Sequence, residues 1–221
     1  RVLSFVDDKD YFIGVNLGVR TTQVGMATLG GEISHEDDFT TPANVKQALE
    51  MARERIENLI RLNAGKTLRV IGVSVPGMTD AERRRLLFAP NLGWREVDLA
   101  DFFQVDENIK VVVENDATAA AMYEARLKLR DSSNGLLTNF ILVRSGTGIG
   151  VGLVIGGEVY RGTGAGRGIA GEFGHMTIVA GGTNSQLTLE FVNRRAITGF
   201  VEICKRRATG PTVNFFGDAP P

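Results

Sequence analysis

An internal repeat constrains this chain more than any other feature of its sequence. The stretch Gly25-Met26-Ala27-Thr28-Leu29-Gly30-Gly31-Glu32 parallels Gly152-Leu153-Val154-Ile155-Gly156-Gly157-Glu158 when one residue of slippage is allowed. In both places an apolar strand, a turn, a second strand and a glycine hairpin precede a third strand. A duplicated β-β-β-α-β-α-β-α unit predicts two α/β lobes with a cleft between them, and such clefts are favoured sites for small ligands.

Residue spacing predicts the elements of both lobes. In the first lobe we expect strands at 11–17, 22–29, 32–40, 69–75, 86–89 and 109–113, and helices at 45–62 and 99–103. In the second we expect strands at 140–143, 149–155 and 158–159 and a helix at 190–208, before an irregular tail at 211–221. The lobes are therefore placed at 11–133 and 134–221. The second lobe is expected to be incomplete, because its sequence ends before the later strands and helices of its counterpart.

Composition narrows the class of protein. Apolar residues make up 43% and charged residues 23% of the chain, which is typical of a globular protein with a substantial core. The net charge of -1 provides no overall basic field for nucleic acid. Arg83-Arg84-Arg85 and Lys205-Arg206-Arg207 are interpreted as solvated edges rather than DNA-binding patches. No apolar run approaches the roughly 18 residues that span a membrane, and the one cysteine, Cys204, suits a reducing cytoplasm.

Asp116 is the first candidate for chemistry. It follows a strand at 109–113 and begins an alanine-rich helix. Open α/β sheets bind their ligands outside the carboxyl ends of the strands. The position also faces a helix N-terminus, whose free N–H groups stabilise negative charge. Two interpretations stay open: Asp116 only caps the helix, or it contacts a ligand.

A glycine-rich stretch follows the strand at 140–143. It begins with Ser145-Gly146-Thr147-Gly148 and ends with Gly171-Glu172-Phe173-Gly174-His175. Glycines allow the backbone to approach a ligand closely, with N–H groups available to phosphate or sugar oxygens. A set of β-turns between short strands is the alternative. Glu172 and His175, framed by glycine, favour a polyhydroxylated ligand.

Four motifs follow one another in order: Val75-Pro76-Gly77, Ala89-Pro90-Asn91-Leu92-Gly93-Trp94, Glu114-Asn115-Asp116 and Gly171-Glu172-Phe173-Gly174-His175. This order resembles the ROK family (repressors, open reading frames and kinases) over residues 11–200. The resemblance implies the two-lobed sugar kinase/Hsp70/actin fold, which is ribonuclease H-like. In the family these motifs are, respectively, a Pro-Gly turn, a sugar-facing segment, the catalytic motif and the most distinctive signature.

The resemblance also implies site residues. Those that would contact sugar hydroxyls are Asn91, Asn115, Asp116, Glu172, His175 and Glu190. For Glu190, an exposed helix start is the alternative. In a family kinase, Asp116 would take the proton from the sugar hydroxyl that attacks the γ-phosphate of ATP. In such a kinase, magnesium would help to hold the nucleotide. The residues that would bind its phosphates are Gly18, Gly146, Thr147 and Gly148.

Two departures from the family pattern change which cofactors we expect this chain to bind. The first phosphate loop of the family has Asp-x-Gly-x-Thr, whereas this chain has Asn16-Leu17-Gly18-Val19-Arg20. Asn16 removes a charge that would favour Mg²⁺, although Arg20 could attract phosphate. The family's cysteine-rich zinc loop is also missing, because no cysteine lies between His175 and Glu190. A structural zinc site needs four ligands, so we expect neither zinc nor any other resident metal.

Three hypotheses for function stay open. The first is the effector domain of a ROK transcriptional regulator, in which a sugar or sugar phosphate in the cleft changes DNA binding by a domain outside this chain. Residues 1–10 are then the linker from a preceding helix-turn-helix. The second is an ATP-dependent sugar kinase with Asp116 as its base, and the third is a sugar-binding protein without DNA binding. The resemblance further implies a homodimer, and we expect no membrane partner.

Overall fold

The computed structural model describes residues 9–130, 138–145, 147–163, 170–171, 178–179 and 186–187. The chain divides into two compact units, Arg1–Ala119 (unit 1) and Ala120–Pro221 (unit 2), and each is described by itself. Helix α3 (Asp116–Arg130) begins in unit 1 and continues into unit 2. The lobe boundary expected between residues 133 and 134 stays a prediction.

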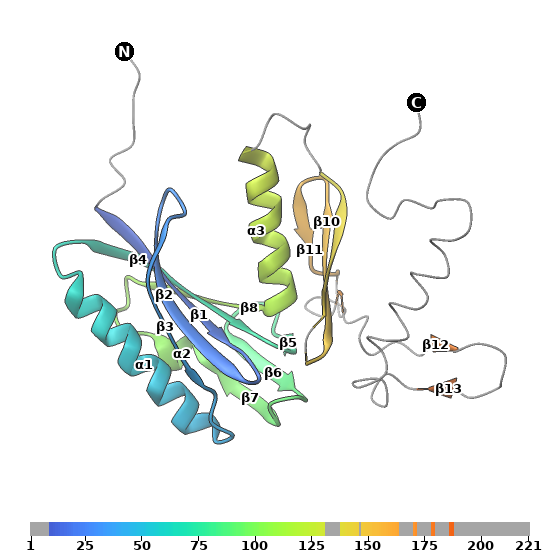
Figure 1. Cartoon of the computed structure of the whole chain (residues 1–221), viewed down its shortest axis with the longest axis horizontal. Helices are drawn as coiled ribbons and strands as arrows, with labels where there is room; N and C mark the ends of the chain where they lie inside the picture. Colours follow the sequence, from blue (N-terminus) through green and yellow to red (C-terminus); the bar gives the residue numbers. More distant parts are fainter. Residues whose placement is uncertain are drawn as a thin grey trace, which may run out of the picture. The chain divides into compact units, whose positions relative to one another are not determined.

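A five-stranded sheet forms the centre of unit 1 (Figure 1). Its strands are β1 (Asp10–Leu17), β2 (Thr21–Thr28), β3 (Ile33–Thr40), β4 (Thr67–Val75) and β8 (Lys110–Asn115). The first three form an antiparallel meander, and β4 and β8 run parallel to β1, which gives the order β3-β2-β1-β4-β8. Alternation along β1 places Ile13, Val15 and Leu17 together on one buried face.

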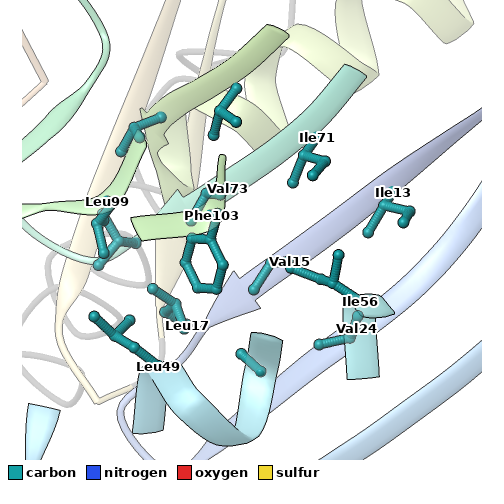
Figure 2. Packing of buried hydrophobic residues seen from close by; sticks show 14 of the residues in the cluster. Ile13, Val15, Leu17, Val24, Leu49, Ile56, Ile71, Val73, Leu99 and Phe103 are labelled. Atoms are coloured by element: carbon teal, nitrogen blue, oxygen red, sulfur yellow. The ribbon is translucent and has the colours of Figure 1, made fainter. Parts of the chain in front are cut away.

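Helix α1 (Val45–Leu62) packs on that face, and its bounds match those predicted. The side-chain oxygen of Asn44 caps the first turn by accepting the Gln47 N–H at 3.0 Å. The buried residues of α1 recur at helical spacing: Ala48, Leu49, Ala52, Ile56 and Leu59. Leu49 and Ile56 belong to the same buried cluster as Val15 and Val24 of the sheet and Phe103 of α2 (Leu99–Phe103) (Figure 2). Full burial of such side chains contributes about 1.5–3 kcal/mol each.

A second, three-stranded sheet extends unit 1. It consists of β5 (Met78–Thr79), β6 (Arg85–Ala89) and β7 (Trp94–Asp98), paired in that order. The sequence predicted β6 but missed β5 and β7. The residues of β7 show no apolar alternation, and Glu96 even has a positive φ of 49°. This strand forms because it pairs with β6, where Ala89 lies opposite the buried Trp94.

Unit 2 contains a three-stranded antiparallel sheet in the order β11-β10-β9. Its strands are β9 (Phe140–Ser145), β10 (Ile149–Ile155) and β11 (Glu158–Tyr160). Ala121 and Ala125 of α3 pack with Val154 on one face of this sheet. A two-stranded ladder joins β12 (Ile178–Val179) to β13 (Gln186–Leu187). The predicted helix at 190–208 and the tail at 211–221 lie outside the described residues.

Candidate functional site

The carboxyl ends of three parallel strands meet at one edge of the five-stranded sheet. The register pairs Asn16 of β1 with Ser74 of β4, and Val75 of β4 with Asn115 of β8. The segments that leave these strands therefore share this edge. They carry Gly18 after β1, Pro76-Gly77 after β4 and Asp116 after β8. Such an edge is where open α/β sheets bind ligands.

Asn115, rather than Asp116, caps helix α3. The Oδ1 atom of Asn115 accepts the N–H groups of Ala117 and Thr118, both at 3.0 Å. The interpretation of Asp116 as the cap is therefore wrong. Asp116 is the first residue of the helix, where its own Oδ1 accepts the Ala117 N–H at 2.9 Å. This places a half-buried carboxylate at the positive end of the α3 dipole.

Gly77 connects the Asn115 side chain to the second sheet. The Nδ2 of Asn115 donates to the Gly77 carbonyl at 3.0 Å. Gly77 has a φ of +105°, and a Cβ atom there would lie 2.2 Å from the Phe88 carbonyl oxygen and 2.8 Å from the Ala89 Cα. Only glycine fits this approach. The turn that carries Asn91 begins at Ala89, because the Leu92 N–H donates to the Ala89 carbonyl at 3.1 Å.

The loop after β1 is closed by hydrogen bonds within the protein. The Gly18 N–H donates to the Asn16 carbonyl at 3.0 Å, and the Gly18 carbonyl accepts the Thr41 hydroxyl at 2.7 Å. A Cβ atom on Gly18 would lie 2.4 Å from the Thr21 carbonyl oxygen, so this position also requires glycine. The buried Thr22 hydroxyl lies 2.9 Å from that of Thr41 and fixes it in place.

The Asn16 side chain is part of the same loop. Its Oδ1 accepts the Ser74 hydroxyl at 2.9 Å, and its Nδ2 donates to the Gln23 Oε1 at 3.1 Å. The amide thus joins three adjacent strands. Ser74 and Thr41 did not emerge from the sequence, because each contributes through a hydrogen bond to a residue far away in the chain.

The other predicted site residues belong to unit 2. Thr147 is exposed and Gly148 half-buried in the turn between β9 and β10. Gly146, Glu172, His175 and Glu190 lie outside the described residues. Among the residues that are described, no group of three or more His, Cys, Asp or Glu side chains is placed to bind a metal ion.

The model of the ROK family matches residues 12–195 of this sequence. The chain belongs to the ROK family. The predicted fold class is confirmed, because the sheet order of unit 1 and the similar solved structures both agree with an actin-like α/β fold. Within the part of the chain that the structure describes, no helix is long and apolar enough to cross a membrane.

Both repressors and kinases are among the relatives of this ROK chain. A xylose repressor from Bacillus spizizenii is 34% identical over 182 residues, which are 80% of this chain and 45% of that protein. A glucokinase from Halalkalibacterium halodurans is 30% identical over 78% of this chain and 51% of the relative. A solved ROK glucokinase from Streptomyces griseus, in complex with glucose and AMPPNP, has a TM-score of 0.65 and 31% identity, and the match covers 76% of this chain and 51% of the other. The chain thus spans about half the length of these relatives.

Proposed function

We propose that this chain is the sugar-binding effector region of a ROK transcriptional regulator. A sugar or sugar phosphate binds at the carboxyl edge of the five-stranded sheet, where Asn91, Asn115 and Asp116 contact its hydroxyls. In the full-length protein, binding changes the DNA affinity of a domain outside this chain. The size of that change is limited by the difference in sugar affinity between the two states of the protein.

The hydrogen bonding of Asn16 is the observation that carries this proposal. Mg²⁺ prefers carboxylate and phosphate oxygens as ligands. Asn16 offers a neutral amide instead, and its Oδ1 already accepts the Ser74 hydroxyl. The Gly18 N–H, which a nucleotide phosphate would need, already donates to the Asn16 carbonyl. These contacts favour a sugar site that works without MgATP, and the sugar-facing residues of unit 1 are retained.

Pyranose sugars with the hydroxyl configuration of xylose and glucose are the ligands to test first. The relatives include a xylose repressor and a glucokinase, and one solved relative binds glucose. The two sugars share their ring hydroxyl configuration and differ by the hydroxymethyl group of glucose. A difference in affinity between them would therefore report the space near that group, and glucose 6-phosphate would test whether Arg20 attracts a phosphate.

An ATP-dependent sugar kinase is the second candidate. The observation that favours it is the position of Asp116 at the end of β8, where a general base could reach a sugar hydroxyl. Thr147 and Gly148 of the second phosphate loop are also retained. Asn16 argues against this candidate, since the reaction needs a metal-bound nucleotide.

Calorimetric titration and a phosphorylation assay on the full-length protein separate the two functions. We expect D-xylose or D-glucose to bind without ATP turnover. Asp116→Asn should weaken binding about 10- to 150-fold, because a hydrogen bond to a charged group contributes about 1.5–3 kcal/mol. Asp38→Asn, which changes an exposed carboxylate on β3, is the matched control and should bind like the wild type. Phosphorylation that Asp116→Asn abolishes would establish the kinase instead, and no binding of any of the three ligands would refute both.

A further inference from the structure

Three consecutive arginines, Arg83 and Arg84 just before β6 and Arg85 at its first position, each pair with acidic residues of a different element. Arg83 pairs with Glu114 of β8, Arg84 with Asp101 of α2, and Arg85 with Glu96 and Asp98 of β7. The charges of this cluster are thus neutralised within unit 1, which is not the arrangement of a nucleic-acid patch. Among the three, the Arg83 pair is the most buried, since the Glu114 side chain is only 9% exposed.

Arg83 contacts β8 through its backbone as well as its side chain. Its carbonyl accepts the Val113 N–H at 2.8 Å, on the outer edge of the sheet. Its Nε lies 3.2 Å from the Glu114 Oε2. Arg83 also has a positive φ of 60°, which is uncommon for a residue other than glycine and requires support from its surroundings. These contacts supply that support.

The two residues that Arg83 contacts directly precede the residues of the candidate site in the sequence. Val113 and Glu114 bind Arg83, and the next residue, Asn115, binds Gly77 and caps α3. The Glu114 Oε1 also accepts the Asn115 N–H at 3.2 Å. The position of Asp116 is therefore determined by three successive attachments of β8 to the segment 77–83.

We propose that Arg83 and Glu114 are positioning residues for the sugar site. The pair fixes the β8–α3 junction, which carries Asn115 and Asp116, against the second sheet, whose β6–β7 turn carries Asn91. This inference rests on the proposed sugar-binding function. Neither residue contacts the sugar; both act by holding the groups that do.

Charge, rather than the direction of a hydrogen bond, carries the contact between these two side chains. The Arg83 Nε is buried, and its N–H has no well-aligned acceptor although the carboxylate is near. Glu114 is the more buried partner, and removing one residue of a buried ion pair usually costs more than replacing both by apolar residues. Lysine at position 83 would retain the charge.

The ion pair between Arg55 and Asp37, whose acid is more exposed, provides a control away from the site. Its Nε–Oδ2 distance is 2.9 Å, and the Arg55 Nε likewise is buried without an aligned acceptor. This pair joins α1 to β3, at the opposite edge of the sheet from β8. Its loss should therefore lower stability without affecting the site.

The test measures sugar affinity by calorimetry and stability by thermal unfolding for each variant of the full-length protein. We expect Arg83→Met and Glu114→Gln each to weaken sugar binding about tenfold, within the range of coupling found between contacting residues. Arg83→Lys should retain most of the affinity, and the double variant Arg83→Met/Glu114→Leu should bind more tightly than either single variant. Arg55→Met should lower the melting temperature less, because Asp37 is largely exposed, and should leave the affinity within about twofold.

Several outcomes would overturn the inference. If Arg83→Met and Glu114→Gln lose stability but bind sugar like the wild type, the pair is only structural. Equal losses of affinity in Arg55→Met would also refute a specific positioning role. If Arg83→Met does not fold, Glu114→Gln still tests the pair, because glutamine preserves the size of glutamate and removes its charge. Failure of the proposed function is distinct: the wild type would not bind sugar, or Asp116→Asn would bind equally well.

Discussion

The β1–β2 hairpin of unit 1 and the β9–β10 hairpin of unit 2 pair their strands alike but bury their side chains differently. Ile13 lies opposite Met26 in the first, as Ile141 lies opposite Leu153 in the second. Ile13 is 1% exposed, whereas Ile141 is 58% exposed. Strand pairing and burial are therefore separate properties of the repeated motif.

Helix α1 explains the difference. It packs on the face of the first hairpin that carries Ile13, whereas none of the described elements covers the corresponding face of the second. On the opposite face, the second hairpin packs Val154 against α3. Turn and strand residues are thus sufficient to specify each hairpin, while burial depends on a helix supplied from elsewhere in the chain.

Truncation of matched isoleucines gives the largest expected contrast between the hairpins. Ile13→Ala should reduce the free energy of unfolding by about 2–5 kcal/mol, because it leaves a cavity in a packed core. Ile141→Ala should cost less than about 1 kcal/mol, because that side chain is mostly in water. Fluorescence of Trp94, the one tryptophan and buried in unit 1, follows the first variant, and hydrogen exchange of β9 follows the second. An equally large cost for Ile141→Ala would mean that another segment covers this face in solution.

Substitution of two glycines with positive φ, one in each unit, compares the cost of backbone strain alone with that of strain plus steric overlap. Gly157→Ala, in the β10–β11 turn, should cost about 1 kcal/mol from backbone strain alone, since nothing lies within 4 Å of the added Cβ. Gly77→Ala adds an overlap with the Phe88 carbonyl and should cost about 2–4 kcal/mol. Because Gly77 also binds Asn115, its variant should lose sugar affinity as well. Denaturant unfolding and calorimetry on both variants check this, and similar costs at the two positions would contradict the overlap.

The smallest expected effect on stability is that of the exposed ion pairs, which salt screens. All ion pairs found among the described residues lie in unit 1, and most of them are exposed. An exposed pair contributes about 0–1 kcal/mol and is screened by salt. Arg84→Gln should therefore change the stability of unit 1 by less than about 1 kcal/mol. Trp94 fluorescence in urea at low and high NaCl measures this, and a loss of several kcal/mol would show that the Arg84–Asp101 pair is structural.

The sequence predicted the elements whose pattern is local. Helix α1 and helix α2 begin and end where the apolar spacing placed them, because their buried residues recur at helical intervals. It missed β5 and β7, which form only by pairing with β6. It left open whether Asp116 caps α3, since aspartate and asparagine are both good caps and only the geometry distinguishes these neighbours.

Contacts between distant residues explain the rest of what the sequence missed. Thr41 reaches Gly18 across 23 positions, and Ser74 reaches Asn16 across 58. No local pattern indicates which of many hydroxyl groups will meet a given amide. Motif order did predict that Asn115 and Asp116 follow a strand at the sheet edge, because the order of strand and helix is local.

The hydrogen bonds of Asn115 restrict what a ligand can offer it. Its oxygen accepts two N–H groups and one amide hydrogen reaches Gly77, so among the described residues one amide hydrogen is left over. In the proposed site, the Asn115 amide can therefore only donate a hydrogen bond to the ligand, whereas the carboxylate of an ionised Asp116 can only accept one. An alcohol group does both at a single oxygen, whereas an ether oxygen or a methyl group cannot. Deoxy and O-methyl sugars should accordingly reveal which ring position lies between the two residues.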